Sequence, residues 1–218
     1  MQEIDIRNWK RKTHYELFGS YANPTYVMEV RLNMTRFMEN KPAGDGFFIP
    51  FTWLLMNAAN AFEGFRIRWL DGRPVLYDAV HPSYTVLLED QNFAFQCTRY
   101  DGSYRTFADA MRRDIAAVRA GAVSGEESGY FQTNVAADLI YISSMPWVDF
   151  RSISNPLPYE NKMSMSIPRF NWGKCVREGD RWAMTLSVTV NHAYIDGYEA
   201  SMMFLKLQDL LDNCRDYF

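Results

Sequence analysis

Cysteine is scarce in this chain, and its distribution limits the chemistry that cysteine could support. The 218 residues include only three cysteines, Cys97, Cys175 and Cys214, which are widely spaced and form no Cys-x-x-Cys motif. An odd and scattered set argues against both a disulfide framework and a zinc site. Reduced thiols are typical of cytoplasmic proteins, so we expect a cytoplasmic location and no bound metal.

Long apolar runs and basic runs are missing as well. The longest uncharged stretch, Phe47 to Phe62, contains Pro50 and is shorter than the roughly 20 apolar residues of a spanning helix. The opening "MQEIDIRNWKRK" has no apolar segment after its basic residues, so we expect no secretory signal. Because the net charge is −3, we expect neither nucleic acid nor a membrane as a partner.

Short alternating runs outnumber helical patterns along the chain. The dipeptide Asp71-Gly72 predicts a tight hairpin turn within "FRIRWLDGRPVLYD", because both residues tolerate positive φ angles. The runs Met163 to Val176 and Trp182 to Val190 flank "REGD" and predict a second hairpin. Further strands are expected in "TYVMEVRL", "YTVLLE", "FAFQCTRY" and "LIYIS". Helices are expected over Arg11 to Phe18, Phe48 to Phe62 and Phe107 to Val118, and near the C-terminus, where Met203, Phe204, Leu207 and Leu211 recur at helical spacing. This pattern predicts an α+β fold in one domain, residues 1–218.

The stretch "VNHAYIDGY" places polar groups where a predicted strand ends and a predicted helix begins. His192 is attractive there because imidazoles titrate near pH 6.5 and can accept and return a proton. Asp196 could cap the following helix, orient a neighbour through its charge, or do both. His14 and His81 lie far away in sequence, so a metal site is not expected. On spacing alone, a structural role for His192 remains the commoner outcome.

Four ordered segments resemble the chloramphenicol acetyltransferase family. "HAYIDG" matches its His-x-x-x-Asp-Gly signature, and Gly173-Lys174 and Gly179-Asp180 precede it in the family's order. "NWKRKTHYELF", "FRIRWLDGRPVLYDAVHPSYTV" and "YISSMPWVDFRS" match other parts of the pattern. The signature alone would be weak evidence, since dihydrolipoamide acyltransferases and peptide-synthetase condensation domains share it. The likeness covers nearly the whole chain.

The resemblance implies a two-layer α+β sandwich with a large mixed, mostly antiparallel sheet and packed helices. It implies a homotrimer with active sites at its subunit interfaces, which moves acetyl from acetyl-CoA to a hydroxyl of chloramphenicol or a similar small molecule. His192 matches the family's general base, and Ser143 matches the hydroxyl that stabilises the oxyanion. Arg11 matches the arginine that pairs with Asp196 and holds the turn carrying His192.

The same resemblance implies substrate-binding roles for further residues. Lys174 and Asn171 match positions near CoA. The acceptor pocket is expected to include aromatic residues, with core packing as the alternative for each: Phe18, Tyr26, Phe93, Phe95, Tyr130 and Tyr141. The chain departs from the family pattern at Asn191, usually histidine, Asn171, usually threonine, Cys175, usually aromatic, and Phe47, usually basic. These departures leave acceptor identity and CoA affinity open.

Two other functions remain alternatives. One is an acyltransferase of the same fold with a different acceptor. The other is a homologue that binds an aromatic ligand without chemistry, against which the retained His192 and Ser143 argue.

Overall fold

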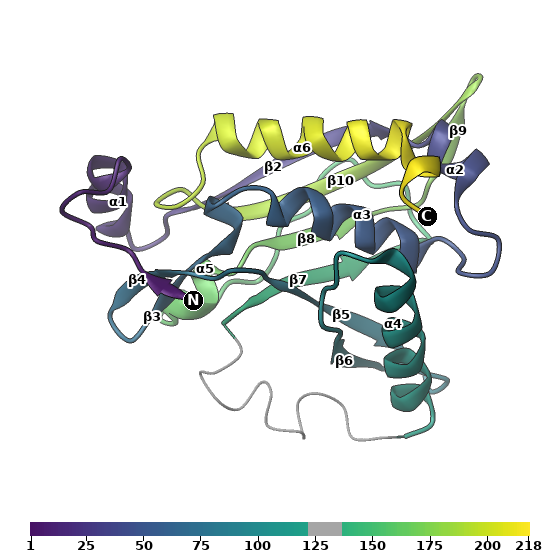
Figure 1. Ribbon diagram of the computed structural model, residues 1–218, viewed down its shortest axis with the longest axis horizontal. Helices are drawn as coiled ribbons and strands as arrows, with labels where there is room; N and C mark the ends of the chain where they lie inside the picture. The colour runs from purple at the N-terminus through teal and green to yellow at the C-terminus, as the bar shows by residue number, and fades with distance from the viewer. Residues whose placement is uncertain (122–136) are drawn as a thin grey trace.

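The chain is built around a seven-stranded sheet, which the computed structural model describes over residues 1–121 and 137–218. Its strands are β2 (Thr25–Asn33), β5 (His81–Leu87), β6 (Phe93–Cys97), β7 (Leu139–Ser144), β8 (Arg169–Trp172), β9 (Val176–Glu178) and β10 (Arg181–Asn191). They lie in the order β2-β10-β8-β7-β5-β6, with β9 paired to β10 (Figure 1). Only β7 runs parallel to its neighbours, β5 and β8, so the sheet is mixed and mostly antiparallel, as predicted.

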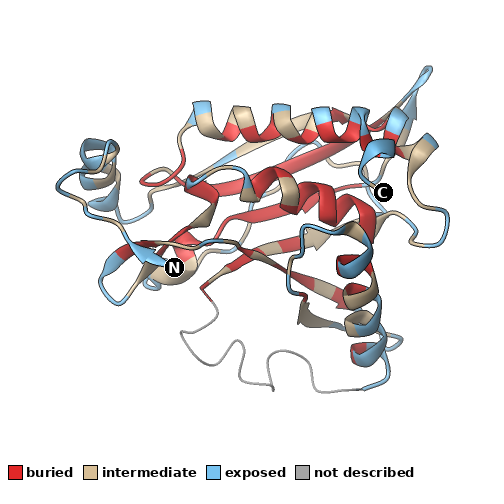
Figure 2. Cartoon of the chain, viewed as in Figure 1, coloured by how far each residue is buried: buried red, intermediate tan, exposed pale blue. Residues whose placement is uncertain are grey.

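Three long helices pack on one face of this sheet: α3 (Phe48–Asn60), α4 (Tyr104–Arg119) and α6 (Gly197–Asp212). Helix α3 is apolar on nearly every side and is buried between the strands and its neighbours, as Figure 2 shows. Pro50 lies in its first turn, where a missing N–H leaves no hydrogen bond unmade. Ser103 caps α4 by accepting a hydrogen bond from the backbone N–H of Thr106. The shorter helices are α1 (Lys12–Gly19), α2 (Thr35–Asn40), α5 (Lys162–Ser166), η1 (Gly64–Arg66) and η2 (Cys214–Asp216).

The two faces of the sheet differ in polarity. On β8, the rings of Phe170 and Trp172 pack against Phe65 and Phe51 on the helical side. Because side chains alternate along a strand, the residues between them point to the opposite face. That face carries buried polar side chains from three strands, β5, β8 and β10: Ser83, Arg169, Asn171, Thr185, Ser187 and Thr189. The second face is therefore suited to hold polar ligands.

The segment of residues 145–161 crosses this polar face and is tied to it by hydrogen bonds. Nη1 of Arg31 donates to Oδ1 of Asp149 at 2.6 Å. Further along, Nδ2 of Asn155 donates to Oγ1 of Thr189 at 3.0 Å. The segment leaves part of the face uncovered, and the pocket described below lies there.

A small sheet of β1 (Gln2–Glu3), β4 (Arg73–Leu76) and β3 (Ile67–Leu70) flanks the large one. The predicted turn joins β3 to β4, with φ of 48° at Asp71 and 85° at Gly72. Within the described residues, no helix has the length and apolarity needed to span a bilayer.

The second predicted hairpin forms between β9 and β10, but the expectation that its first arm runs over Met163 to Val176 is wrong. The first residues of that range belong to α5, which Asn161 caps by accepting a hydrogen bond from the Ser164 N–H at 2.9 Å. The remainder divides into β8 and the first residue of β9, because the chain leaves the ladder at Gly173 to Cys175. There the N–H of Lys174 bonds the carbonyl of Val148 instead of a neighbouring strand.

Candidate active site

The turn between β10 and α6 positions His192. Strand β10 pairs with β2 up to Asn191, and the His192 N–H then donates to the Pro24 carbonyl at 2.8 Å. Helix α6 begins at Gly197 and is capped by Asp196, whose Oδ1 accepts from the Glu199 N–H at 2.9 Å. A strand and a capped helix therefore fix the turn at both ends, which limits how far the imidazole can move.

Arg11 and Asp196 form an ion pair beneath this turn. Nη1 of Arg11 lies 2.7 Å from Oδ2 of Asp196, and the two side chains are 13% and 31% exposed. Partial burial acts to raise the pKa of Asp196, but the Glu199 N–H and the Arg11 guanidinium together hold it below its ordinary value. The carboxylate therefore stays charged at neutral pH and ties the segment before α1 to the turn.

Aromatic rings enclose the His192 imidazole. The ring of Phe18 stacks on it with centroids 3.9 Å apart and planes 10° apart, and the Tyr26 ring lies at 5.0 Å. Burial chiefly raises the pKa of Tyr26 to about 12, so this phenol is neutral at pH 7. Nδ1 of His192 is buried without a hydrogen-bond partner among the described residues. The imidazole is thus oriented by stacking rather than by a hydrogen bond.

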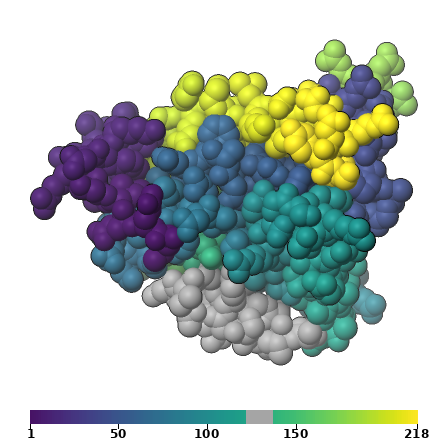
Figure 3. Space-filling view, in the orientation of Figure 1, coloured from purple at the N-terminus to yellow at the C-terminus, as the bar shows by residue number. Residues whose placement is uncertain are grey.

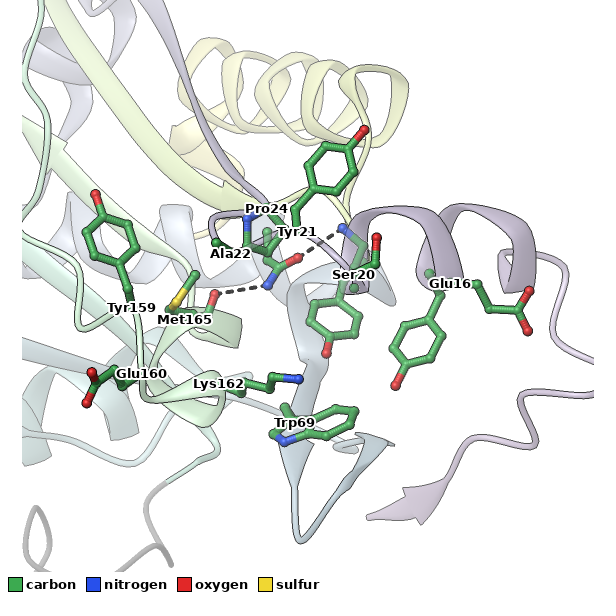
Figure 4. A pocket seen from close by; sticks show the side chains of 15 residues that line it. Glu16, Ser20, Tyr21, Ala22, Pro24, Trp69, Tyr159, Glu160, Lys162 and Met165 are labelled. Atoms are coloured by element: carbon green, nitrogen blue, oxygen red, sulfur yellow. Dashed lines mark hydrogen bonds between the residues drawn. The ribbon is translucent and has the colours of Figure 1, made fainter.

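His192 lies at the end of the molecule formed by α1, which projects as the purple segment in Figure 3. A cavity of about 610 Å³ lies beside the turn (Figure 4), lined by Asn191 and Ala193 but not by His192. Oδ1 of Asn191 accepts from the Ala193 N–H at 2.9 Å, while its Nδ2 donates to the Met165 carbonyl at 3.4 Å. Asn191 therefore ties the turn to α5.

Ser143 lines a second cavity, of about 360 Å³, on the polar face of the sheet. Three further residues from the predicted site share it: Phe95, Tyr141 and Asn171. Burial raises the pKa of Tyr141, so its hydroxyl can donate a hydrogen bond at neutral pH. Asn171 is 2% exposed, and its Nδ2 has no partner among the described residues. The cavity is within the range of small-molecule sites.

Three remaining predicted residues do not line this cavity. Phe93 is 58% exposed and contacts the Phe95 ring edge-on at 5.4 Å. Lys174 is exposed just beyond the end of β8. Tyr130 lies outside the described residues.

Strand register separates the two groups of residues within one chain. Ser143 pairs with Asn171 across β7 and β8, and Asn171 pairs with Ser187 across β8 and β10. His192 lies five positions beyond Ser187, which places it about 17 Å further along the strand direction. A single subunit therefore does not bring the His192 imidazole and the Ser143 hydroxyl to one reacting atom.

Sequence reasoning missed four polar residues that line the Ser143 cavity: Ser83, Thr85, Asn155 and Arg169. Arg169 stands between Pro168 and Phe170, and the alternation of β8 was the available signal that it shares a face with Asn171. Among the described residues, no group of three or more His, Cys, Asp or Glu side chains could hold a metal ion.

Comparisons with known proteins agree with the geometry of the turn and the sheet. Residues 1–208 match the family model of chloramphenicol acetyltransferase. The chain belongs to the chloramphenicol acetyltransferase family. A chloramphenicol acetyltransferase of Escherichia coli is 33% identical over 211 residues, covering 96% of this chain and 93% of that protein. The family inferred from the sequence is thus confirmed, and the chain is an enzyme of the acetyltransferase class.

Solved structures show the fold as well. A chloramphenicol acetyltransferase structure superposes with a TM-score of 0.82 at 27% identity, covering 96% of this chain and 99% of that one. A probable dihydrolipoamide acetyltransferase from Listeria monocytogenes superposes with a TM-score of 0.65 at 14% identity, covering 92% and 89%. This member of the chloramphenicol acetyltransferase family therefore has the acyltransferase fold that its sequence predicted.

Proposed function

We propose that this enzyme transfers the acetyl group of acetyl-CoA to a hydroxyl of chloramphenicol or a similar small molecule. The observation that carries the proposal is the match to chloramphenicol acetyltransferases over 96% of the chain. It spans the segments that hold His192, Ser143 and Asp196. The enzyme would act as a single domain over residues 1–218 and in the cytoplasm, where acetyl-CoA is available.

The reaction needs a base, because a neutral hydroxyl is a poor nucleophile toward a thioester. His192 removes the hydroxyl proton as the acceptor oxygen attacks the acetyl carbonyl. The tetrahedral intermediate then collapses, its carbon–sulfur bond breaks, and the protonated His192 returns a proton to the CoA thiolate. A positioned base of this kind contributes about 10²- to 10⁴-fold in rate. Both substrates are bound together, so no acyl-enzyme is required.

The attack places negative charge on the carbonyl oxygen, and Ser143 donates a hydrogen bond to that oxyanion. Loss of one such donor costs about 10²- to 10³-fold in kcat. The neighbouring Asn171 supplies an unpaired amide near the same thioester. Lys174, exposed beyond β8, neutralises phosphate charge of CoA.

The active site is proposed to form between subunits of a homotrimer. Support comes from the strand register, which sets His192 and Ser143 about 17 Å apart along the sheet of one chain. His192 also lies at one end of the subunit, beside the projecting α1, where a neighbour can reach it (Figure 3). In a ring of three identical subunits, His192 of each would face the Ser143 cavity of the next.

Release of free CoA thiol from acetyl-CoA in the presence of chloramphenicol tests this function. We expect turnover that His192→Ala lowers about 10²- to 10⁴-fold. His14→Ala is the matched control, because His14 is exposed on α1, and it should leave turnover unchanged. Equal turnover of His192→Ala and the parent enzyme would refute the assignment of the base.

An acceptor panel separates the alternatives. Thiol release with other alcohols, amines or thiols but not chloramphenicol would indicate an acyltransferase with a different acceptor. Calorimetric binding of chloramphenicol without acetylation of any acceptor would indicate a non-catalytic homologue.

A further inference from the structure

The cavity that contains Ser143 also contains a buried positive charge. Arg169 lines this cavity and is only 7% exposed. Among the described residues, no carboxylate forms an ion pair with its guanidinium. An arginine remains protonated under almost all conditions, so a ligand that enters the cavity meets a positive charge.

Among the described residues, the groups that hold the guanidinium in place are all neutral. Nη1 donates to the Ile167 carbonyl at 3.0 Å, and Nη2 donates to the carbonyl and Oγ of Ser164, both at 3.0 Å. The Tyr141 ring lies 5.3 Å from the guanidinium carbon. Burial is the main influence on the pKa of Arg169, and it lowers that pKa. The donors are oriented, but the charge is not compensated.

An uncompensated buried charge is unfavourable unless a partner arrives. A purely structural role is the alternative, in which Arg169 closes the end of α5 by binding its last carbonyls. Two neighbours on the same face speak against that reading. Nδ2 of Asn171 and Oγ of Ser187 are buried and unpaired among the described residues, and these residues are 2% and 0% exposed. Asn171 lines the cavity and Ser187 pairs with it from β10, so unpaired polar groups lie in and beside the cavity wall, as in a ligand site.

The position of Arg169 along β8 indicates which substrate it would contact. Asn171 is the direct neighbour of Ser143, and Arg169 lies two residues before it, toward the His192 end of β10. Lys174 lies on the other side, beyond the end of β8. If CoA phosphates approach Lys174, as proposed above, Arg169 lies on the acceptor side of the thioester. Arg169 is one strand across from Ser143 and two residues along the strand, which separates the two backbone positions by about 8 Å. That is roughly the span of a substituted aromatic ring.

Resting on the proposed acetyl transfer, we propose that Arg169 selects acceptors that carry a carboxylate about one aromatic ring away from the hydroxyl to be acetylated. The guanidinium would bind the carboxylate through charge-assisted hydrogen bonds, while the hydroxyl lies near Ser143. Neutral acceptors of the same shape would be accepted less well, because they leave the guanidinium uncompensated. Arg169 is thus a specificity-determining residue of the acceptor pocket.

Chloramphenicol provides a matched probe. Its para-nitro group and a carboxylate have the same shape and differ by one negative charge. We expect the parent enzyme to acetylate the 4-carboxyphenyl analogue with a kcat/KM at least about tenfold above its kcat/KM for chloramphenicol. This comparison requires no variant, so a folding defect cannot obscure it. Equal or lower kcat/KM for the carboxylate would overturn the proposal.

Variants then assign the preference to Arg169. Arg169→Met should reduce the preference for the carboxylate at least about tenfold. Arg169→Lys should retain part of it, because it keeps the charge but not the fork of donors. Neither variant should raise the KM for acetyl-CoA. A higher KM for acetyl-CoA with unchanged acceptor preference would assign Arg169 to the CoA phosphates and overturn the acceptor assignment.

Failure of the proposed function is distinguishable from failure of this inference. If no acceptor releases CoA thiol, calorimetry with the 4-carboxyphenyl analogue still decides the point. The carboxylate site would be supported without any turnover by two affinity differences. The parent enzyme should bind chloramphenicol at least about tenfold more weakly than the analogue, and Arg169→Met should bind the analogue at least about tenfold more weakly than the parent enzyme does. Binding that is the same for both ligands would leave Arg169 as a clamp on α5 only.

Discussion

The ion pair between Arg11 and Asp196 makes a prediction that separates two roles of one carboxylate. Oδ1 of Asp196 caps α6, and its Oδ2 binds Arg11 at 2.7 Å. Asp196→Asn keeps a capping oxygen and removes the charge, whereas Asp196→Ala removes both. Comparing the two variants therefore measures the ion pair and the cap separately.

The structure sets the expected magnitude. A hydrogen bond to a charged partner contributes about 1.5–3 kcal/mol. Nε and Nη2 of Arg11 already lack partners among the described residues, so Asp196→Asn leaves the guanidinium poorly compensated. A chain of this size loses about 2–4 °C in Tm for each kcal/mol, which predicts a fall of about 3–12 °C. Loss of the cap in Asp196→Ala should cost about 1 kcal/mol more.

Thermal unfolding followed by circular dichroism at pH 7 measures these shifts. Arg11→Met combined with Asp196→Asn should recover part of the loss, because the guanidinium that needs the carboxylate is then gone. Glu39→Gln is the control, since its ion pair with Arg36 is exposed and contributes at most about 1 kcal/mol. Because the same turn holds His192, kcat of Asp196→Asn should fall about 10²-fold. A Tm within 1 °C of the parent enzyme, with kcat retained, would refute the reasoning.

Three further outcomes follow from the same structure. The Tm difference between the parent enzyme and Asp196→Asn should persist above about pH 4 and shrink below it, because the lowered pKa of Asp196 contributes stability only while the carboxylate is charged; a difference that grows in acid would contradict this. Gly173→Ala should lose about 1–3 kcal/mol, because a Cβ there would lie 2.8 Å from the Val148 carbonyl, and Gly19→Ala, with open space around it, should not; equal stabilities would show that the segment yields. Burial raises the pKa of Cys175 to about 11, so at pH 8 iodoacetamide should label it far more slowly than a free cysteine, as peptide mass spectrometry would show; fast labelling would mean the thiol is more open than described.

Local chemistry was enough to predict much of the fold. Asp71 and Gly72 adopt the positive φ angles that their turn requires, and Asp196 caps the helix that follows it. Alternation along Trp182 to Val190 correctly indicated the long strand β10. The family likeness added the sheet's overall character, which local patterns do not contain.

The arrangement of the site could not be predicted from local patterns. Whether Ser143 lies near His192 depends on the strand order β10-β8-β7, which is set by contacts between distant segments. For the same reason, the sequence analysis did not single out Arg169. Only the pairing of β8 with β7 places it in the cavity with Ser143.

The proposal that His192 of one subunit acts with Ser143 of another can be tested by assembling two disabled chains together. His192→Ala and Ser143→Ala subunits should each be nearly inactive alone. When they are refolded together in equal amounts, we expect recovery of about a quarter of the parent activity, because that share of interfaces joins an intact His192 to an intact Ser143. Mixed trimers with no more activity than the two single variants added together would contradict the shared active site.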